Sequence, residues 1–263
     1  MDLKNSIWNK ESYQEFINYL ISLEDIEYKN FHSKLLGVEK NLIGIRTPKL
    51  KEIAKEISKG EWKDFINYSQ NTYYEEGVIK GLVLGFIKVD YEVRKGYIDS
   101  FIAEIDNWAT CDIVVGNLKF LNKEKERYYE FIKECTSSDD PWKIRFGLVT
   151  LLDYYLEEKY IDEIFPLCSS IASKEYYVKM AQAWLISIMF IKFREKTLEY
   201  LKENSLDSWI HNKAIQKIRE STRVSKEEKD FILQFKRELK WGCCKKYTTP
   251  SIESSEKANL LSS

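Results

Sequence analysis

Residues 140–171, DPWKIRFGLVTLLDYYLEEKYIDEIFPLCSSI, contain two successive helical patterns that decide the fold. The first pattern begins at Asp140 and Pro141 and is strongly apolar, whereas the second, residues 158–171, carries more charge. Apolar residues recur at helical spacing in both, and a proline at the start is typical of the first turn of a helix. Neither helix can bury its apolar face alone, so the pair needs neighbours to stack against.

The same two-helix pattern returns along the chain. First helices are predicted to begin, at intervals of 32 to 34 residues, near Glu75, Asn107, Asp140, Lys174 and Asp207. A more charged second helix is predicted after each of them, over residues 91–105, 123–135, 158–171, 194–201 and 226–236. A regular two-helix period of this size is typical of an α-solenoid, and no segment alternates like a strand, so the sequence predicts an all-α fold.

The composition excludes several classes of protein. The 263 residues include only 10 Gly and 4 Pro, whereas a β-protein needs turn residues at every hairpin. No Gly-rich phosphate loop is present, and His32 and His211 are too few for a multi-histidine metal centre. Cys111, Cys135 and Cys168 fall in apolar helical patterns and no CxxC pair occurs. We therefore expect no metal, no cofactor and a reducing compartment, the cytoplasm.

No apolar segment of the sequence is long enough to cross a membrane as a helix. The longest apolar run, residues 180–191, is far shorter than the span of about 20 residues that a bilayer requires. We predict one helical domain over residues 1–240. Residues 241–263 end in a Ser-rich stretch without an apolar stripe, so we expect a disordered C-terminal tail there.

Charge is unevenly distributed, although the formal net charge of the whole chain is only −1. Residues 190–246 hold 15 Lys and Arg against 9 Asp and Glu, whereas residues 1–189 hold 25 against 31. A helical repeat protein with one basic end suits an anionic partner, and the alternative is an ordinary solvated surface. The side chains of the basic region that we expect to contact phosphates are Lys213, Lys217, Arg219 and Arg223.

Trp108 and Asp112 are four residues apart on a predicted helix, so their side chains share one face. This pair suits a site where positive charge develops, because the carboxylate stabilises a cation and the indole supplies a cation-tolerant apolar wall. A structural alternative stays open, in which Asp112 caps a turn or pairs with a lysine.

Two further candidates lie on the first helices of the next two repeats. Arg145 has apolar and aromatic neighbours, so we expect it to be partly desolvated and to need a carboxylate or phosphate partner. Trp184 lies in the most apolar helix of the chain. Their structural alternatives are an ion pair with a neighbouring repeat for Arg145 and core packing for Trp184. Corresponding helices of adjacent repeats line one surface of a solenoid, so the spacing allows both residues to converge with Trp108 and Asp112.

In the order of its segments the chain resembles the bacterial AlkD-type DNA alkylation repair proteins, which are HEAT-like-repeat DNA glycosylases. The segments that carry the resemblance, between about residues 25 and 238, are GIRTPKLKEIAKEI, NWATCD, PWKIRFGLVTLLDYY, KEYYVKMAQAW and NKAIQKIRES. The resemblance implies an α-solenoid of HEAT-like helical pairs that removes positively charged N3- and N7-alkylated purines from duplex DNA. It also implies that Asp112 is the catalytic carboxylate, Trp108 and Trp184 its paired indoles, and Arg145 the active-site arginine.

The chain departs from this family at several positions. Better-characterised members have an acid close to the first tryptophan, where this chain has Ala109 and Thr110, and no Arg-Glu pair follows Trp184. Two functions therefore stay open. The first is a base-excision DNA glycosylase, which we expect to act as a monomer in the cytoplasm, or at the nucleoid if the source is bacterial. The second is a non-catalytic HEAT-like scaffold that binds DNA structures or another anionic partner.

Overall fold

The structure, a computed structural model, describes residues 1–36 and 41–238. Over these two ranges the chain forms fourteen α-helices and no β-strand. The prediction of an all-α, solenoid-like fold of helical pairs is confirmed. The tail expected at residues 241–263 lies outside the described residues.

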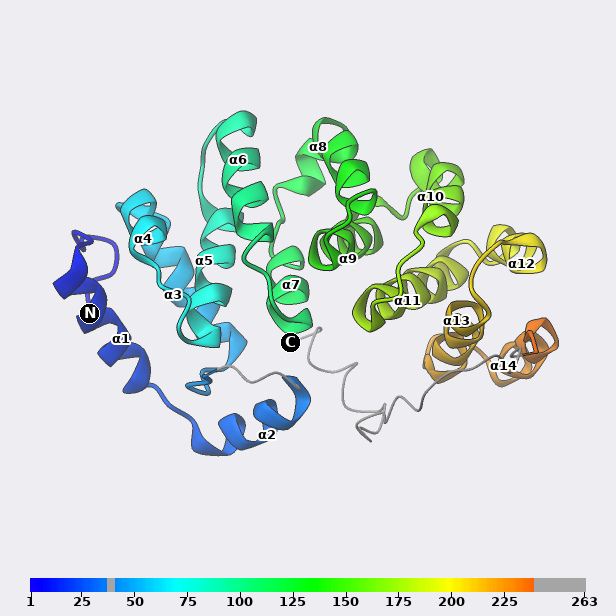
Figure 1. The fold of residues 1–263 in the computed structure, drawn as a ribbon, viewed down its shortest axis with the longest axis horizontal. Coiled ribbons are helices and arrows are strands. Elements are labelled where there is room, and N and C mark those ends of the chain that lie inside the picture. The colour runs from blue at the N-terminus through cyan, green and yellow to red at the C-terminus, as the bar shows by residue number, and fades with distance from the viewer. Residues whose placement is uncertain (37–40, 239–263) are drawn as a thin grey trace. The chain divides into compact units, whose positions relative to one another are not determined.

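The helices follow one another in pairs (Figure 1). The two that precede the repeats are α1 (Lys10–Ile21) and α2 (Ile26–Leu36). The first helices of the pairs are α3 (Thr47–Ile57), α5 (Tyr74–Phe86), α7 (Trp108–Val115), α9 (Pro141–Thr150), α11 (Tyr176–Lys192) and α13 (Ser208–Glu220). The second helices are α4 (Trp62–Tyr68), α6 (Tyr91–Ile102), α8 (Leu121–Thr136), α10 (Glu158–Ser170), α12 (Arg194–Glu203) and α14 (Lys226–Phe231). The five predicted first helices begin within two residues of their expected positions.

The chain divides between Lys123 and Glu124 into two compact units. Unit 1 holds α1 to α7 and the first residues of α8, and unit 2 holds the described elements that follow. The division lies inside α8, where Glu124 leaves the helical conformation with φ −120° and ψ 19°. The expected single domain over residues 1–240 stays a prediction.

In unit 1 the first helices pack in chain order, α3 against α5 and α5 against α7. α5 is the central element, and its residues from Tyr74 to Leu84 are all buried. A glycine makes the close packing possible, because a Cβ atom at Gly81 would lie 2.4 Å from the side chain of Val114 and 2.5 Å from that of Phe101. Any larger residue at position 81 would force α5 away from α6 and α7.

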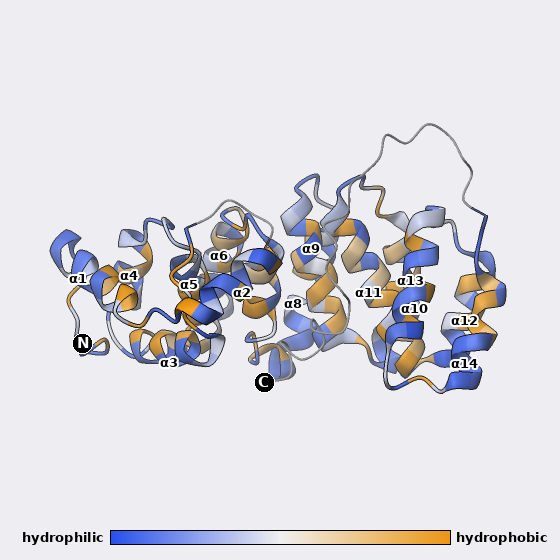
Figure 2. Cartoon of the chain, turned by 90° about the horizontal axis from the view of Figure 1, so that it is seen from below, coloured by the Kyte–Doolittle hydropathy of each residue, from blue (hydrophilic) through white to orange (hydrophobic). Residues whose placement is uncertain are grey.

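In unit 2 the same arrangement recurs, with α11 packed between α9 and α13. The sides of the helices that face one another are apolar, and the outer sides are polar (Figure 2). α9 continues into a π-helical turn, η1 (Leu151–Tyr155), and α14 into a 3₁₀ turn, η2 (Ile232–Phe235). The buried His211 of α13 binds the carbonyl of Phe235 with its Nε2 over 2.8 Å, which holds η2 on this helix.

Candidate functional site

The short helix α7 positions Trp108 and Asp112. Asn107 caps this helix: its Oδ1 accepts the N–H of Thr110 over 2.8 Å, and its Nδ2 donates to the Thr110 hydroxyl over 2.9 Å. Asp112 therefore lies in the body of the helix, one turn after Trp108, and the cap is made by a different residue. The two side chains share one face, as the four-residue spacing predicts.

Trp108 and Asp112 differ in their exposure. Asp112 is only 4% exposed, whereas Trp108 is half-buried. A buried carboxylate interacts with a nearby cation more strongly than an exposed one, because the surrounding dielectric is lower. α7 thus combines a carboxylate suited to stabilising positive charge with an indole that reaches the surface.

Tyr74, which lies within electrostatic reach of Asp112, belongs to a buried cluster of aromatic and polar side chains. Tyr74 is 1% exposed, and its hydroxyl has no hydrogen-bond partner in the part of the chain that the structure describes. Burial raises the pKa of Tyr74 well above its usual value, and the negative charges of Glu75 and Asp112 add to this. The ring of His32 meets Tyr74 edge-on, with 5.1 Å between the ring centroids.

His32 is held neutral in this cluster. Its Nδ1 lies 2.7 Å from the hydroxyl of Tyr28, and burial lowers its pKa to about 4. The contact between Tyr74 and His32 was not predicted from the sequence, because both residues occur on otherwise apolar helical stripes. The available signal was the presence of titratable groups at positions that the periodicity assigns to the core.

Glu75 holds the backbone segment that precedes α3 in the sequence. Its carboxylate is completely buried and accepts the N–H groups of Ile43, Gly44 and Ile45 over 3.0, 2.7 and 3.2 Å. Gly44 has a φ of 99°, and a Cβ atom there would lie 2.7 Å from the Cβ of Lys29. This segment therefore requires glycine, and Glu75 serves the scaffold of unit 1.

In unit 2, Arg145 joins α9 to the start of α11. The side chain is 5% exposed, and its Nη1 donates to the backbone carbonyl of Tyr177 over 2.7 Å. Its guanidinium carbon also lies 6.0 Å from the centroid of the Tyr177 ring. One partner of Arg145 is thus a backbone carbonyl of the next repeat, a partner that the sequence reasoning did not include.

Trp184 keeps part of its surface exposed. It is half-buried on α11, whereas its neighbours Ala183 and Leu185 are completely buried. Partial burial of this kind is ordinary for a side chain as large as tryptophan, so the role of Trp184 in a site stays a prediction.

The four expected phosphate-binding residues do not share one face. Lys213 and Lys217 are one turn apart on α13, whereas Arg219 points to a different side of the helix and Arg223 follows its end. Both arginines are exposed, and both lysines are half-buried. The structure therefore brings Lys213 and Lys217 together and separates them from Arg219.

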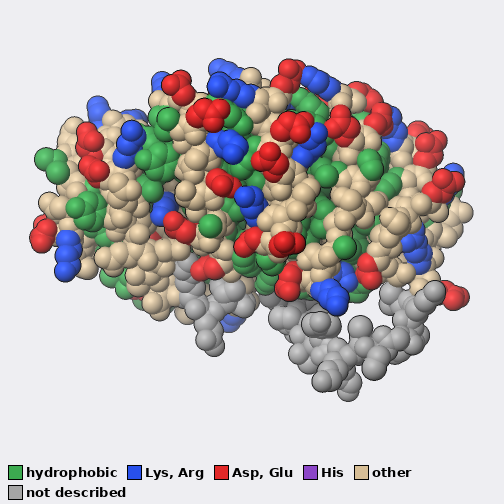
Figure 3. Space-filling model, turned by 45° about the horizontal axis from the view of Figure 1, so that its top comes forward, with side chains coloured by type: hydrophobic (Ala, Val, Ile, Leu, Met, Phe, Trp, Pro, Cys, Tyr) green, Lys and Arg blue, Asp and Glu red, His purple; other side chains and the backbone are tan. Residues whose placement is uncertain are grey.

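The basic excess of the C-terminal region is smaller in the described residues. Residues 190–238 hold 12 Lys and Arg against 9 Asp and Glu, because Lys240, Lys245 and Lys246 lie outside the described ranges. Acidic and basic side chains are interspersed on the face shown in Figure 3. Any attraction for DNA in the described part of the chain therefore comes from local groups of side chains.

A family model described as DNA alkylation repair enzyme matches residues 14–218. The chain belongs to this family. The match accords with the AlkD-type resemblance, and it supports a role in the repair of alkylated DNA. None of the curated proteins compared with the chain matches it. The matched range includes Trp108, Asp112, Arg145 and Trp184, and it ends one residue before Arg219.

Two features of the described residues concern metal ions and membrane spans. Over residues 1–36 and 41–238, no group of three or more His, Cys, Asp and Glu side chains is placed to hold a metal ion. None of the helices in these ranges has the length and apolar character needed to cross a membrane.

Cys111, Cys135 and Cys168 are buried thiols, and burial raises the pKa of Cys168 to about 12, which makes it a poor nucleophile.

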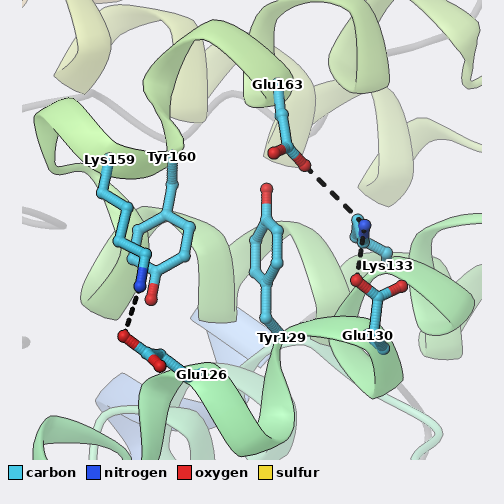
Figure 4. A pocket seen from close by; sticks show the side chains of 7 residues that line it. All are labelled: Glu126, Tyr129, Glu130, Lys133, Lys159, Tyr160 and Glu163. Carbon is cyan, nitrogen blue, oxygen red and sulfur yellow. Dashed lines mark hydrogen bonds and ion pairs between the residues drawn. The ribbon is translucent and has the colours of Figure 1, made fainter.

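A small hollow between α8 and α10 is lined by charged and tyrosine side chains (Figure 4). The lining residues are Glu126, Tyr129, Glu130, Lys133, Lys159, Tyr160 and Glu163. Lys133 lies 2.7 Å from Glu130 and 3.7 Å from Glu163, and Lys159 pairs with Glu126. The hydroxyl of Tyr129 is directed toward Glu163 (Figure 4), and burial raises its pKa. These carboxylates outnumber the lysines, so the hollow does not suit a phosphate group.

Proposed function

We propose that the chain is a DNA glycosylase that excises positively charged N3- and N7-alkylated purines from duplex DNA. The observation that carries the proposal is the arrangement on α7, where a buried carboxylate lies one turn from a half-buried indole in a member of the DNA alkylation repair family. No cofactor is required for this reaction. The alkylated purine is already cationic, so it leaves without a strong general acid.

The barrier then lies in the positive charge that develops on the deoxyribose as its bond to the base breaks. Asp112 would stabilise this oxocarbenium character and orient the water that attacks the sugar carbon. Trp108 would pack against the sugar as a cation-tolerant wall. The products are the free base and an abasic site.

Unit 2 would supply groups that bind the same DNA. Trp184 would pack against the sugar and backbone, and the positive charge of Arg145 would attract a phosphate. The lysines and arginines at positions 213, 217, 219 and 223 would hold further phosphates. The resemblance implies an approach from the backbone side, with the lesion still largely stacked in the duplex.

A second candidate is a non-catalytic HEAT-like scaffold that binds DNA structures. Two observations favour it: Asp112 is nearly inaccessible at 4% exposure, and Arg145 donates to a backbone carbonyl. A scaffold would use the same basic side chains without excising a base.

The release of 7-methylguanine and 3-methyladenine from methylated duplex DNA tests the proposal. We expect the protein to release both cationic bases from the methylated duplex. It should release no uracil, a neutral base, from a duplex that contains uracil instead. Binding of methylated duplex without release of either base would contradict the glycosylase and favour the scaffold.

A further inference from the structure

Four aromatic rings form a continuous row in unit 2, across the first turns of α9, α11 and α13. Trp142 and Tyr177 are stacked, with 5.4 Å between ring centroids and 29° between ring planes. Tyr177 meets Tyr176 edge-on at 5.3 Å, and Tyr176 meets Trp209 at 6.0 Å. We name these four residues the aromatic row. Trp142, Tyr176 and Trp209 are 34 and 33 residues apart, so each successive repeat contributes a ring at its start.

All four rings of the row are partly accessible to solvent. Tyr176 is 48% exposed, and Trp142, Tyr177 and Trp209 are half-buried. The aromatic cluster of unit 1 around Phe16 and Phe65 is different, because those two rings are completely buried. A contiguous set of partly exposed aromatic side chains suits a binding surface.

Three basic side chains approach rings of the row. Arg145 approaches the Tyr177 ring at 6.0 Å, and the ammonium groups of Lys179 and Lys213 lie 4.8 and 6.0 Å from the centroid of Trp209. Lys179 also pairs with Asp207 over 3.1 Å, which offsets part of the positive charge. The row is thus an apolar, aromatic surface with a modest basic character.

We propose that the aromatic row binds a single DNA strand through its unpaired bases. Aromatic rings interleaved with cations are the chemistry that recognises single strands, because every base has a π-face and every nucleotide a phosphate. A single strand leaves its base faces accessible, whereas a duplex hides them.

This surface goes beyond the proposed glycosylase, since it requires neither Asp112 nor an alkylated base. It would hold an unpaired strand of the kind found beside a gap or at a melted end. Because Lys179 is shared with Asp207, stacking rather than phosphate contact would supply most of the affinity. We therefore expect a weaker dependence on salt than for the duplex.

Fluorescence anisotropy with a labelled oligothymidine of about 12 nucleotides tests the proposal. The full chain should bind this strand, and a strand of the same length built from abasic nucleotides should bind much more weakly. The variant carrying Tyr176→Ala and Trp209→Ala should lose about tenfold or more in affinity for oligothymidine. Tyr68→Ala removes an exposed tyrosine of α4 in unit 1 and is the matched control, with unchanged affinity expected.

Two further measurements separate stacking from misfolding and from the proposed catalysis. Tyr176→Phe keeps the ring and should bind as the wild type does, whereas Tyr176→Leu should bind several-fold more weakly. Release of methylated purines from duplex DNA should stay at the wild-type level in all these variants. Equal binding of the abasic strand, unchanged affinity in the double variant, or displacement of the strand by polyglutamate at equal concentration would overturn the proposal.

Discussion

The Nη1 atom of Arg145 donates a hydrogen bond over 2.7 Å to the backbone carbonyl of Tyr177. This bond connects two successive repeats of unit 2, and it fixes a buried positive charge at the start of α11. Arg145 therefore combines a structural role, which the geometry shows, with the phosphate-binding role that we propose.

Arg145→Met tests the structural role. The variant keeps the apolar stem but loses a hydrogen bond from a charged donor, so the free energy of unfolding should fall by about 1.5–3 kcal/mol. Urea denaturation measures this value, with Arg219→Met, an exposed arginine of α13, as the control that should change little. If Arg145→Met is more stable than the wild type, the desolvation of the buried charge destabilises the fold by more than the hydrogen bond stabilises it. Ligand binding would then be the main role of Arg145.

Variants of Lys213 and Lys217 test whether the basic surface of α13 binds DNA. Replacing both by Ala should weaken binding of duplex DNA uniformly across sequences and reduce the salt slope by about one unit for each lost phosphate contact. The paired variant Arg219→Ala with Arg223→Ala probes a different side of the same region. If neither pair alters the affinity or the slope, this surface is only solvated.

The low pKa of His32 should lower the free energy of unfolding in mild acid. Burial lowers its pKa to about 4 in the folded protein, whereas an unfolded chain takes up this proton near pH 6.5. Stability from this group is therefore complete above pH 6.5 and is lost as the pH falls toward 4, by about 2 kcal/mol between pH 7 and pH 5.

His32→Gln should remove this dependence, because glutamine does not titrate. Denaturant unfolding at pH 7 and at pH 5 should show a smaller stability difference between the two pH values for the variant than for the wild type. His211 is common to both proteins, so its contribution cancels in the comparison. An equal difference in the two proteins would mean that His32 is not held neutral by its surroundings.

The helical pairs were predictable from the sequence because their signal is local. The start of α9 at Pro141 and the apolar stripe of α11 are set by residues within a few turns of each other. The division at Glu124 was not predictable, because a single helical pattern runs through residues 123–135 and the loss of helical geometry at Glu124 leaves no mark in it.

The candidate site was predictable only in part. The spacing of Trp108 and Asp112 fixes their shared face, but it says nothing about how deeply each side chain is buried. The carbonyl partner of Arg145 was missed, because any residue type can supply a backbone carbonyl and the sequence does not mark which one lies nearby. Tyr74 was missed because an aromatic residue on an apolar stripe looks like ordinary core.

The rate at which Asp112→Asn releases 7-methylguanine from methylated duplex DNA, compared with the wild type, tests the central claim most directly. Asparagine keeps the shape of the side chain and removes its negative charge. We predict a rate lower by roughly 10²–10³, as expected when one preorganised electrostatic group is lost, with DNA binding unchanged or slightly tighter. Asp64→Asn, an exposed position on α4, should keep the wild-type rate. An active wild type with an equally active Asp112→Asn variant would contradict the account.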